Sequence, residues 1–343
     1  MLISDVLKQL SVGKSLSASD AEHFMNALMD GDVSPIQTAG AIAAMAVRGE
    51  SAAEITGFAK AMRNHGIVLN VPYDVVDTCG TGGDGSDTFN ISTAAAFVCA
   101  AAGVPVAKHG NRAASSKSGS ADVLQALGVN LNITHEDALT CLSKTNLCFL
   151  FAPYFHPAMK HAAEPRKQLG FRTIFNILGP LTNPARAKYQ VIGVFREDLV
   201  TKVATSLRDL GLTHALVVYG AGGLDELSLA GESLVAEVKD GNIQEYYISP
   251  EQVSLTPAPV SAVVGGDSDF NADLIRKIFT GERGAPRDVV LFNAGAALYV
   301  AGKCETLKDG VRKAAEAIDS RRAQEKLDAF VGLTNSFQRA EVV

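Results

Sequence analysis

The spacing of apolar positions divides the chain into two parts with different patterns. Residues 1–70 show helical periods throughout, in which apolar side chains recur every three or four positions. Three serines, each followed three residues later by Asp, Gln or Glu, mark helix starts: Ser17, Ser34 and Ser51. A glycine stands near the expected end of each of these helices. We therefore expect this part of the chain to be entirely helical.

From Val71 onward, short β-branched runs alternate with helical periods. This alternation is typical of right-handed βαβ units and predicts a largely parallel sheet. Strands are expected at 75–77, 104–107, 148–151, 190–195 and 215–219, and helices at 92–102, 121–127, 136–143 and 198–210. The runs 234–238 and 244–248, joined by Asp240-Gly241, predict an antiparallel hairpin. The tail from Asp288 has a helical pattern, most clearly at 307–318 and 323–330.

The expected fold class is α/β, with a small N-terminal α-helical domain plus a larger α/β domain built on a central, mostly parallel sheet. Residues from about 157 to 187 have helix and Pro/Gly loop character without strands, and we expect them to pack back onto the N-terminal helices. The helical domain then comprises 1–70 with about 157–187, and the α/β domain comprises 71–156 and 188–343. The helix after Pro35 is apolar on much of its circumference, so its own domain or a partner subunit should cover more than one side.

Composition narrows the function classes. The 343 residues are 47% hydrophobic and 20% charged, with a formal net charge of −6, whereas a nucleic-acid binder usually has a basic footprint. Five cysteines without C-x-x-C spacing argue against a disulfide framework or zinc site and favour a reducing cytoplasm. The longest apolar stretch, 94–107, is too short to span a bilayer, and the start, with Asp5, lacks the pattern of a signal peptide. We expect a cytoplasmic protein without nucleic-acid or membrane partners.

A glycine-rich segment, CGTGGDGSDTFNIST at 79–93, lies between a predicted strand and a predicted helix. Glycines at such a junction let backbone N–H groups approach a ligand closely, and the helix N-terminus favours an anion. The polar side chains of Asn90, Ser92 and Thr93 follow the glycines and can bond phosphate oxygens. The segment matches neither a Walker A motif nor G-x-G-x-x-G, and a plain tight turn remains the alternative.

A cationic segment, KHGNRAASS at 108–116, follows the next predicted strand, and no Asp or Glu occurs between Asp87 and Asp122. Lys108 and Arg112 can neutralise phosphate, and arginine can bind it in a bidentate manner. Because neighbouring parallel strands end at the same edge of a sheet, both segments should meet there and hold a ligand with several phosphates. A solvated basic loop remains the alternative. His109 is more often a packed histidine than a catalytic base in such a position.

Two further groups of charged residues stand out. Asp225 and Glu226 follow the predicted strand 215–219, and paired carboxylates at a strand end suit Mg²⁺, although acidic residues also favour a helix N-terminus. Arg166 and Arg172 precede the Pro/Gly-rich loop, and one of these arginines could bind a substrate carboxylate.

The segments GTGGDGSDTFNIST, VAKHGNRAASSKSGSADVLQALGV, CFLFAPYFHPAMKHAAEPRKQLGFRTIFNILGPLTNP and GLDELSL, in this order, resemble the anthranilate phosphoribosyltransferase family over essentially the whole chain. The resemblance implies a helical domain hinged to an α/β domain, usually dimerised through the helical part. It implies transfer of a phosphoribosyl group from 5-phosphoribosyl-1-pyrophosphate (PRPP) to the amine of anthranilate in tryptophan biosynthesis, with Mg²⁺ as cofactor and release of pyrophosphate.

The resemblance also implies roles for individual residues. The expected PRPP contacts are Gly80, Gly83, Asp84, Thr88, Asn90, Ile91, Ser92, Thr93, Lys108, His109, Gly110, Asn111, Arg112, Ala113, Ala114, Ser115, Ser116 and Ser120. The expected anthranilate contacts are Gly80, Asn111, Arg166, His109 and Tyr154, and the expected metal ligands are Ser92, Asp225 and Glu226. No residue is expected to act as a catalytic base, because the arylamine is already neutral at neutral pH and positioning and electrostatics suffice.

Two other functions fit part of the pattern. A pyrimidine nucleoside phosphorylase shares the architecture and the glycine-rich loop but usually carries an additional C-terminal domain, for which this chain is short. A non-catalytic, nucleic-acid-binding relative is expected to be basic, whereas this chain is acidic and keeps Asp225 and Glu226.

Overall fold

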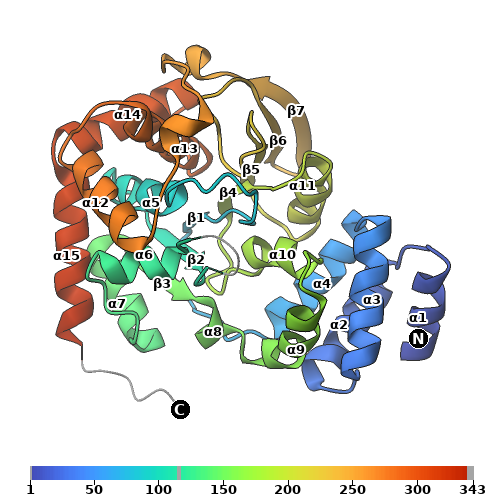
Figure 1. Cartoon of the computed structure of the whole chain (residues 1–343). Coiled ribbons are helices and arrows are strands. Elements are labelled where there is room, and N and C mark those ends of the chain that lie inside the picture. The colour runs from blue at the N-terminus through green and yellow to red at the C-terminus, as the bar shows by residue number, and fades with distance from the viewer. Residues whose placement is uncertain (1, 114–116, 338–343) are drawn as a thin grey trace.

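Four helices form the N-terminal lobe, and the last three begin where the three serine signals predict a helix start. They are α1 (Ile3–Ser11), α2 (Ala18–Asp30), α3 (Pro35–Arg48) and α4 (Ala52–His65). The hydroxyls of Ser17, Ser34 and Ser51 accept hydrogen bonds from the N–H groups three residues later. Such caps contribute about 1 kcal/mol each to helix stability. The computed structural model describes residues 2–113 and 117–337, shown as a ribbon in Figure 1.

The second lobe is built on a seven-stranded sheet in the order β3-β2-β1-β4-β5-β6-β7. Its strands are β1 (Val76–Thr78), β2 (Val106–Gly110), β3 (Leu147–Phe151), β4 (Tyr189–Gly193), β5 (His214–Tyr219), β6 (Ser233–Lys239) and β7 (Asn242–Ile248). The first five strands are parallel, and β6 and β7 are antiparallel. Asp240 and Gly241 have φ of 49° and 80° and make the predicted hairpin turn. The predicted α/β fold class is therefore confirmed.

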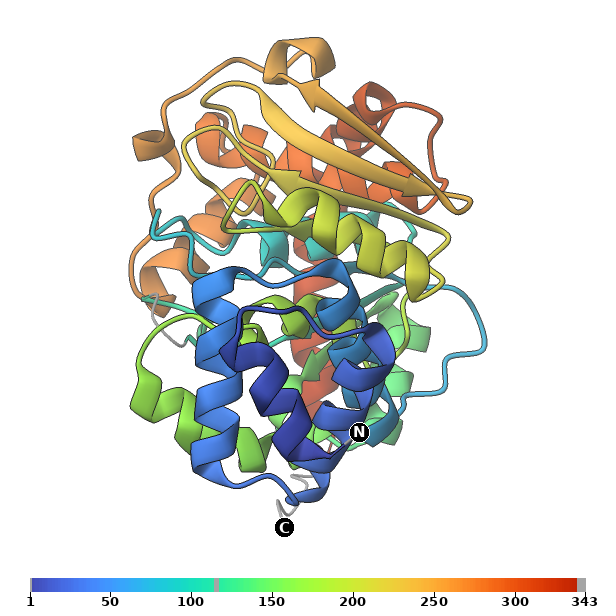
Figure 2. The ribbon, with the colours of Figure 1, turned by 90° about the vertical axis from the view of Figure 1, so that its right-hand side faces the viewer.

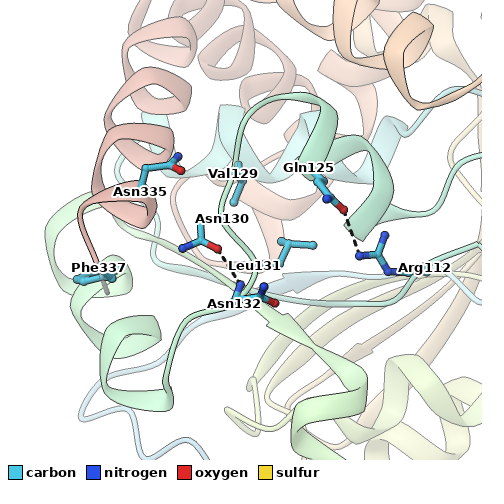
Figure 3. Close-up of a pocket in the computed structure, with 8 residues that line it drawn as sticks. All are labelled: Arg112, Gln125, Val129, Asn130, Leu131, Asn132, Asn335 and Phe337. Carbon is cyan, nitrogen blue, oxygen red and sulfur yellow. Dashed lines mark hydrogen bonds between the residues drawn. The ribbon is translucent and has the colours of Figure 1, made fainter. Parts of the chain in front are cut away.

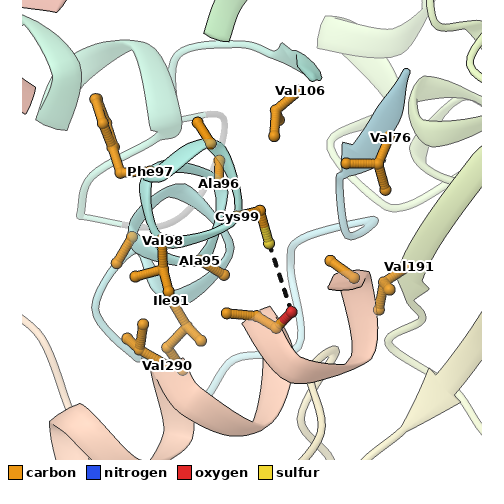
Figure 4. Packing of buried hydrophobic residues seen from close by; sticks show 14 of the residues in the cluster. Val76, Ile91, Ala95, Ala96, Phe97, Val98, Cys99, Val106, Val191 and Val290 are labelled. Atoms are coloured by element: carbon orange, nitrogen blue, oxygen red, sulfur yellow. Dashed lines mark hydrogen bonds between the residues drawn. The ribbon is translucent and has the colours of Figure 1, made fainter. Parts of the chain in front are cut away.

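Alternate residues of the central strands point into two different cores. On β5, Leu216 and Val218 join one core, while Ala215 and Val217 join the other. Helices cover the first face: α5 (Ile91–Ala101), α6 (Ser120–Ala126), α7 (His135–Thr145), α12 (Ser268–Phe279), α13 (Ala285–Val300), α14 (Leu307–Asp319) and α15 (Arg322–Ser336). Figure 4 shows α5 and α13 side by side against the sheet, where the Cys99 thiol donates to the carbonyl of Ala294 at 3.5 Å.

The second face of the sheet carries α11 (Leu199–Asp209) and, beyond it, the N-terminal helices. One continuous apolar core includes Phe58 of α4, Val203 of α11 and Val217 of β5. The two lobes therefore share buried surface on this side of the sheet. Figure 2 shows the N-terminal helices in front, below α11.

A returning segment comes back from the sheet to the N-terminal helices. It contains α8 (Ala152–Phe155), η1 (Pro157–Met159), α9 (Lys160–Leu169), α10 (Phe175–Leu178) and η2 (Gly179–Thr182). Helix α9 lies against α2 and α3, and Figure 1 shows it beside these helices. The Arg63 guanidinium of α4 donates a hydrogen bond of 2.6 Å to the carbonyl of Leu181. This segment holds the helical lobe close to the strand ends.

One helix of the fold is absent from the sequence expectation. Helix α12 begins after Asp267, whose carboxylate accepts a hydrogen bond from the Phe270 N–H. Two short 3₁₀ helices, η3 (Pro250–Val253) and η4 (Val260–Val263), precede it along the chain. Among the described residues, no helix combines the length and the apolar character needed to cross a membrane.

Candidate active site

The glycine-rich loop, residues 79–90 between β1 and α5, lies against the turn that follows β5. The Gly82 N–H donates a 2.6 Å hydrogen bond to Oδ2 of Asp225. A Cβ on Gly80 would lie 2.5 Å from the same oxygen, and one on Gly193 would lie 1.5 Å from the Asp225 carbonyl oxygen. Any side chain at these two glycines would push the turn away, so their absence of a Cβ brings the loop and the carboxylate together.

The acidic turn, Asp225-Glu226, gathers negative charge at this strand edge. The Ser92 N–H, in the first turn of α5, donates to Oε1 of Glu226 at 3.2 Å, and the Asp225 N–H donates to Oδ2 of Asp84 at 3.3 Å. Burial raises the pKa of both carboxyls of the turn. Repulsion from Asp84 adds to this at Asp225, and repulsion from Asp225 adds to it at Glu226. Crowded carboxylates of this kind favour a bound cation.

The oxygen donors of the acidic turn fit Mg²⁺. Within residues 2–113 and 117–337, no three His, Cys, Asp or Glu side chains gather into a metal site made by protein alone. Mg²⁺ commonly uses one or two carboxylates and takes its remaining ligands from water and substrate phosphates. The hydroxyl of Ser92, next to Glu226, is a further oxygen donor at the same place.

Lys108 lies beneath the site rather than on its surface. Only 3% of this residue is exposed, and its ammonium donates to the carbonyl of Thr78 and, at 3.3 Å, to the hydroxyl of Ser92. Its charge opposes the rise in the pKa of Glu226. We conclude that Lys108 supports Ser92 and the acidic turn from behind.

The cationic loop, which the structure describes at 111–113 and 117–119, is held by Asp122 of α6. This carboxylate accepts hydrogen bonds from the N–H groups of Ala113 and Gly119 at 2.9 and 3.0 Å. Arg112 pairs with it at 2.8 Å and also donates to Gln125 at 3.1 Å. Figure 3 shows Arg112 and Gln125 bordering a cavity of about 540 Å³ beside this loop. The Arg112 charge is thus already partnered in this structure.

Further expected PRPP contacts lie where the end of β2 meets the start of α6. Asn111 is exposed, and its carbonyl accepts a 3.2 Å hydrogen bond from the Ser120 hydroxyl. A Cβ on Gly110 would lie 2.2 Å from that hydroxyl oxygen, so the strand end and the start of α6 are in close contact. The expected contacts Ala114, Ser115 and Ser116 lie outside the described residues.

The expected PRPP contacts in the glycine-rich loop and the first turn of α5 differ in how deeply they are buried. Gly83, Thr88 and Asn90 are half-buried, whereas Ile91 and Thr93 are 1% exposed. The Thr93 hydroxyl has no hydrogen-bond partner within the described part of the chain. Thr93 therefore faces the interior of the α/β lobe.

Two buried histidines face each other where the returning segment meets β2. The rings of His109 and His156 lie 5.3 Å apart between centroids. The His109 Nδ1 lies 3.0 Å from the Gly179 carbonyl, which can only accept, so Nδ1 carries the proton and Nε2 is bare. Neither Nε2 atom has a partner among the described residues. Burial lowers the pKa of His109 to about 3 and that of His156 to about 4.

His156 is a residue that sequence reasoning missed. It precedes Pro157 at the start of the returning segment, far from His109 in the sequence. The only sequence signal is a histidine-proline pair next to the apolar stretch 148–151. Pairing β2 with β3 brings the two histidines together.

The two arginines singled out by sequence have separate surroundings. The Arg166 guanidinium lies over the Phe175 ring at 5.1 Å, and burial lowers its pKa. The Arg172 guanidinium lies over Phe195 at 4.9 Å, and its Nε would be 3.1 Å from a Cβ on Gly83. Within the described residues, no carboxylate lies within 4.0 Å of either guanidinium. Both cations are free to receive an anion.

The Tyr154 side chain is engaged elsewhere. Its hydroxyl donates a 2.8 Å hydrogen bond to Oδ1 of Asn132, which lines the cavity of Figure 3. Its ring packs edge-on against Phe151 at 5.1 Å. The anthranilate contact expected for Tyr154 stays a prediction.

The fold and the site define the class of protein. A family model described as "Glycosyl transferase family, helical bundle domain" matches residues 4–66, and one described as "Glycosyl transferase family, a/b domain" matches residues 72–324. The chain is therefore a glycosyltransferase with a helical lobe and an α/β lobe.

Individual relatives narrow this class. The anthranilate phosphoribosyltransferase of Brevibacillus brevis is 52% identical over 95% of this chain and 96% of its own length. The crystal structure of the Thermus thermophilus enzyme of the same name has a TM-score of 0.91 at 46% identity, covering 96% of this chain and 99% of that one. The Saccharomyces cerevisiae enzyme, in complex with PRPP and Mg, has a TM-score of 0.89 at 26% identity, with 98% of both chains covered. The chain belongs to the anthranilate phosphoribosyltransferase family, which confirms the resemblance seen in the sequence and the predicted enzyme class.

We predict that His156 stays neutral at mildly acidic pH and makes stability pH-dependent. Its folded-state pKa of about 4 lies below the ordinary 6.5, so its contribution to stability is complete above about pH 6.5 and is lost as pH falls toward 4. Between about pH 7 and pH 5, wild type should lose about 2 kcal/mol more unfolding free energy than His156→Gln. Urea unfolding followed by circular dichroism measures this difference. Burial, the main cause of the low pKa of His109, remains in the variant, so equal pH dependence of the two proteins would contradict the assignment.

Proposed function

We propose that this chain transfers the 5-phosphoribosyl group of PRPP to the amine of anthranilate and releases pyrophosphate, as a step of tryptophan biosynthesis. The observation that carries the proposal is the acidic turn held against the N–H groups of Gly82 and Ser92. This arrangement combines carboxylates for Mg²⁺ with a glycine-rich loop and a helix N-terminus for phosphate. The Brevibacillus brevis and Thermus thermophilus relatives carry the name of this activity.

We propose that PRPP binds along the glycine-rich and cationic loops. The N–H groups of the glycine-rich loop and the hydroxyls of Ser92 and Ser120 can bond its phosphate oxygens. Arg112 can reach an anion by exchanging its contact with Asp122, whose side chain stays bonded to two backbone N–H groups. The structure of the yeast relative, in complex with PRPP and Mg, supports PRPP as the ligand.

Asp225, Glu226 and Ser92 are the proposed ligands of Mg²⁺. When bound there, Mg²⁺ neutralises the negative charge that develops on the departing pyrophosphate. The chain itself contributes N–H donors that are already oriented, so they need no reorganisation as the bond to C1 breaks. Lys108 holds the Ser92 hydroxyl from behind and keeps this group in place.

Anthranilate is proposed to bind between the returning segment and β2. Arg166, which has no acidic partner within the described residues, can pair with the anthranilate carboxylate. The His156 ring lies beside His109, and the bare Nε2 of His109 can accept a hydrogen bond from the anthranilate amine. Because both rings are neutral and the arylamine is also neutral, the site holds the nucleophile without a strong base. A yeast relative in complex with 4-fluoroanthranilate supports this substrate class.

The α3 helix carries the proposed homodimer surface. Ile36 and Val47 are 85% and 89% exposed, and with Gly40 and Ala43 they form one stripe along α3. A Cβ on Gly40 would meet no atom within 4 Å, so this stripe is open in the single chain. Figure 2 shows α3 on the outside of the helical lobe. We further propose a cytoplasmic location, which fits five free cysteine thiols in a reducing compartment.

Loss of anthranilate fluorescence on mixing with PRPP and Mg²⁺ tests the activity. Wild type should consume anthranilate, whereas Asp225→Asn with Glu226→Gln should lower turnover on the order of 10³-fold and shift the Mg²⁺ dependence, because the neutral amides bind the cation poorly. Glu232→Gln, at an exposed carboxylate in the next loop, is the matched control and should behave like wild type. An unchanged Mg²⁺ response would remove the acidic turn from the metal site. Phosphorolysis of thymidine or uridine in place of anthranilate consumption would overturn the proposed function.

Removing the Arg166 guanidinium should change KM for anthranilate much more than KM for PRPP. We predict that Arg166→Ala raises KM for anthranilate on the order of 10- to 100-fold, the expected loss of a charge-assisted hydrogen bond, while KM for PRPP changes less than about threefold. Steady-state kinetics with each substrate varied in turn measures both constants. Lys167→Ala removes an adjacent exposed cation and serves as the control. Equal losses for both substrates would refute this role of Arg166.

Charges placed on α3 should separate the proposed dimer. We predict that Ile36→Glu with Val47→Glu gives a monomer, because four carboxylates would face one another across the symmetric interface. Light scattering after size-exclusion chromatography measures the mass. Tyr247→Glu, at an exposed aromatic residue of β7, should leave the mass unchanged. A wild-type monomer, or a double variant that stays dimeric, would exclude this surface.

A further inference from the structure

Asn271 of α12 belongs to a chain of hydrogen bonds that reaches both substrate-binding loops. Its Oδ1 accepts from the Gly266 N–H at 2.8 Å, and its Nδ2 donates to Oδ1 of Asn90 at 3.0 Å. The Nδ2 of Asn90 donates to the Ser118 carbonyl at 3.1 Å. Asn90 belongs to the glycine-rich loop and Ser118 to the cationic loop, so one relay ties the two loops to α12.

Backbone groups at both ends fix the direction of this relay. The Gly266 N–H can only donate, so the oxygen of the Asn271 amide must face it. The Ser118 carbonyl can only accept, so the nitrogen of the Asn90 amide must face that group. Between these ends, the Asn271 nitrogen meets the Asn90 oxygen at 3.0 Å, and neither amide can rotate by half a turn without losing two bonds.

The segment before α12 reinforces the same connection. The Gly265 N–H donates to the Asp87 carbonyl at 2.7 Å, and the Phe89 N–H donates to the Val263 carbonyl at 3.2 Å. A Cβ on Gly265 would lie 2.6 Å from both the Asn271 Oδ1 and the Phe89 Cα. The end of the glycine-rich loop is therefore packed against backbone that Asn271 holds.

Because the relay is buried, each of its amide groups depends on the hydrogen-bond partner that it has in the structure. Asn271 is 1% exposed and Ser118 is 9% exposed, so water cannot readily replace a lost partner. Helix α12 lies against α6, at the far end of the cationic loop, as Figure 1 shows. No sequence motif singles out Asn271, and its own amide has no bond to the acidic turn or to the returning segment.

We propose that Asn271 is a positioning residue that sets the affinity for PRPP by holding the Asn90 amide in one orientation between the two loops. This inference rests on the proposed function, because it takes PRPP as the ligand of both loops. It assigns Asn271 no role toward anthranilate, whose proposed contacts lie on the returning segment and β2.

Asn271→Asp is the sharpest test, because it keeps the shape and the acceptor for Gly266 while placing an oxygen against the Asn90 oxygen. KM for PRPP should rise at least about tenfold, with KM for anthranilate within about twofold of wild type. Ile275→Ala leaves the relay intact but opens a cavity in the same helix. It should lower the melting temperature while leaving KM for PRPP within about twofold, which separates positioning from loss of helix stability. Equal changes in both KM values for Asn271→Asp, or a tenfold rise for Ile275→Ala, would overturn the proposal.

A double-mutant cycle tests whether Asn271 acts through Asn90. If it does, Asn271→Ala should raise KM for PRPP in wild type but add less than about twofold in the Asn90→Ala background. Multiplying effects would show that the two residues act independently and would contradict the relay. A wild-type protein that consumes no anthranilate would refute the proposed function itself. An active wild type, together with an Asn271→Asp variant in which KM for PRPP does not rise more than KM for anthranilate, would refute only the role of Asn271.

Discussion

Close contact between the acidic turn and two glycines is the constraint on which the site depends. A Cβ on Gly193, at the end of β4, would lie 1.5 Å from the Asp225 carbonyl oxygen, and one on Gly80 would lie 2.5 Å from the Asp225 carboxylate. Because only hydrogen occupies these positions, the turn after β5 can cross the end of β4 and reach the loop after β1. The carboxylates of the turn then meet backbone N–H groups instead of bulk water.

This contact has an electrostatic cost that explains the chemistry of the site. Each N–H donor contributes about 1 kcal/mol, whereas taking an ionised group out of water costs several kcal/mol. This desolvation cost is offset only in part by the N–H donors of Gly82 and Ser92 and by the charge of Lys108. The pKa of each carboxyl in the acidic turn therefore stays raised. A divalent cation with phosphate ligands would supply the missing positive charge, so the acidic turn favours binding of the substrate together with the metal.

The positions of the binding loops could be predicted from the sequence, but the directions in which their side chains point could not. Glycines and cations at successive strand ends predict which loops meet, because parallel strands share one edge. They do not predict that Lys108 would lie beneath Ser92, since β2 is buried on both faces and shows no alternation. For His156 the local sequence offers only a histidine-proline pair, and for Asn271 it offers no motif. His156 meets its neighbour because β2 pairs with β3, and Asn271 meets its neighbour because of the way α12 packs. The spacing of apolar residues predicts neither contact.

The second substrate's proposed position depends on both lobes at once. The His109 ring belongs to β2, but its tautomer is set by the Gly179 carbonyl of the returning segment. Arg172 of that segment stacks on Phe195, which follows β4, and lies beside Gly83. Packing of the returning segment thus controls which imidazole nitrogen is bare and where the free cations lie. The proposed substrate, a neutral amine that carries a carboxylate, suits neutral imidazoles on β2 and the returning segment and guanidinium groups without an acidic partner on that segment, whereas a charged amine would lose hydration without gaining an acidic partner.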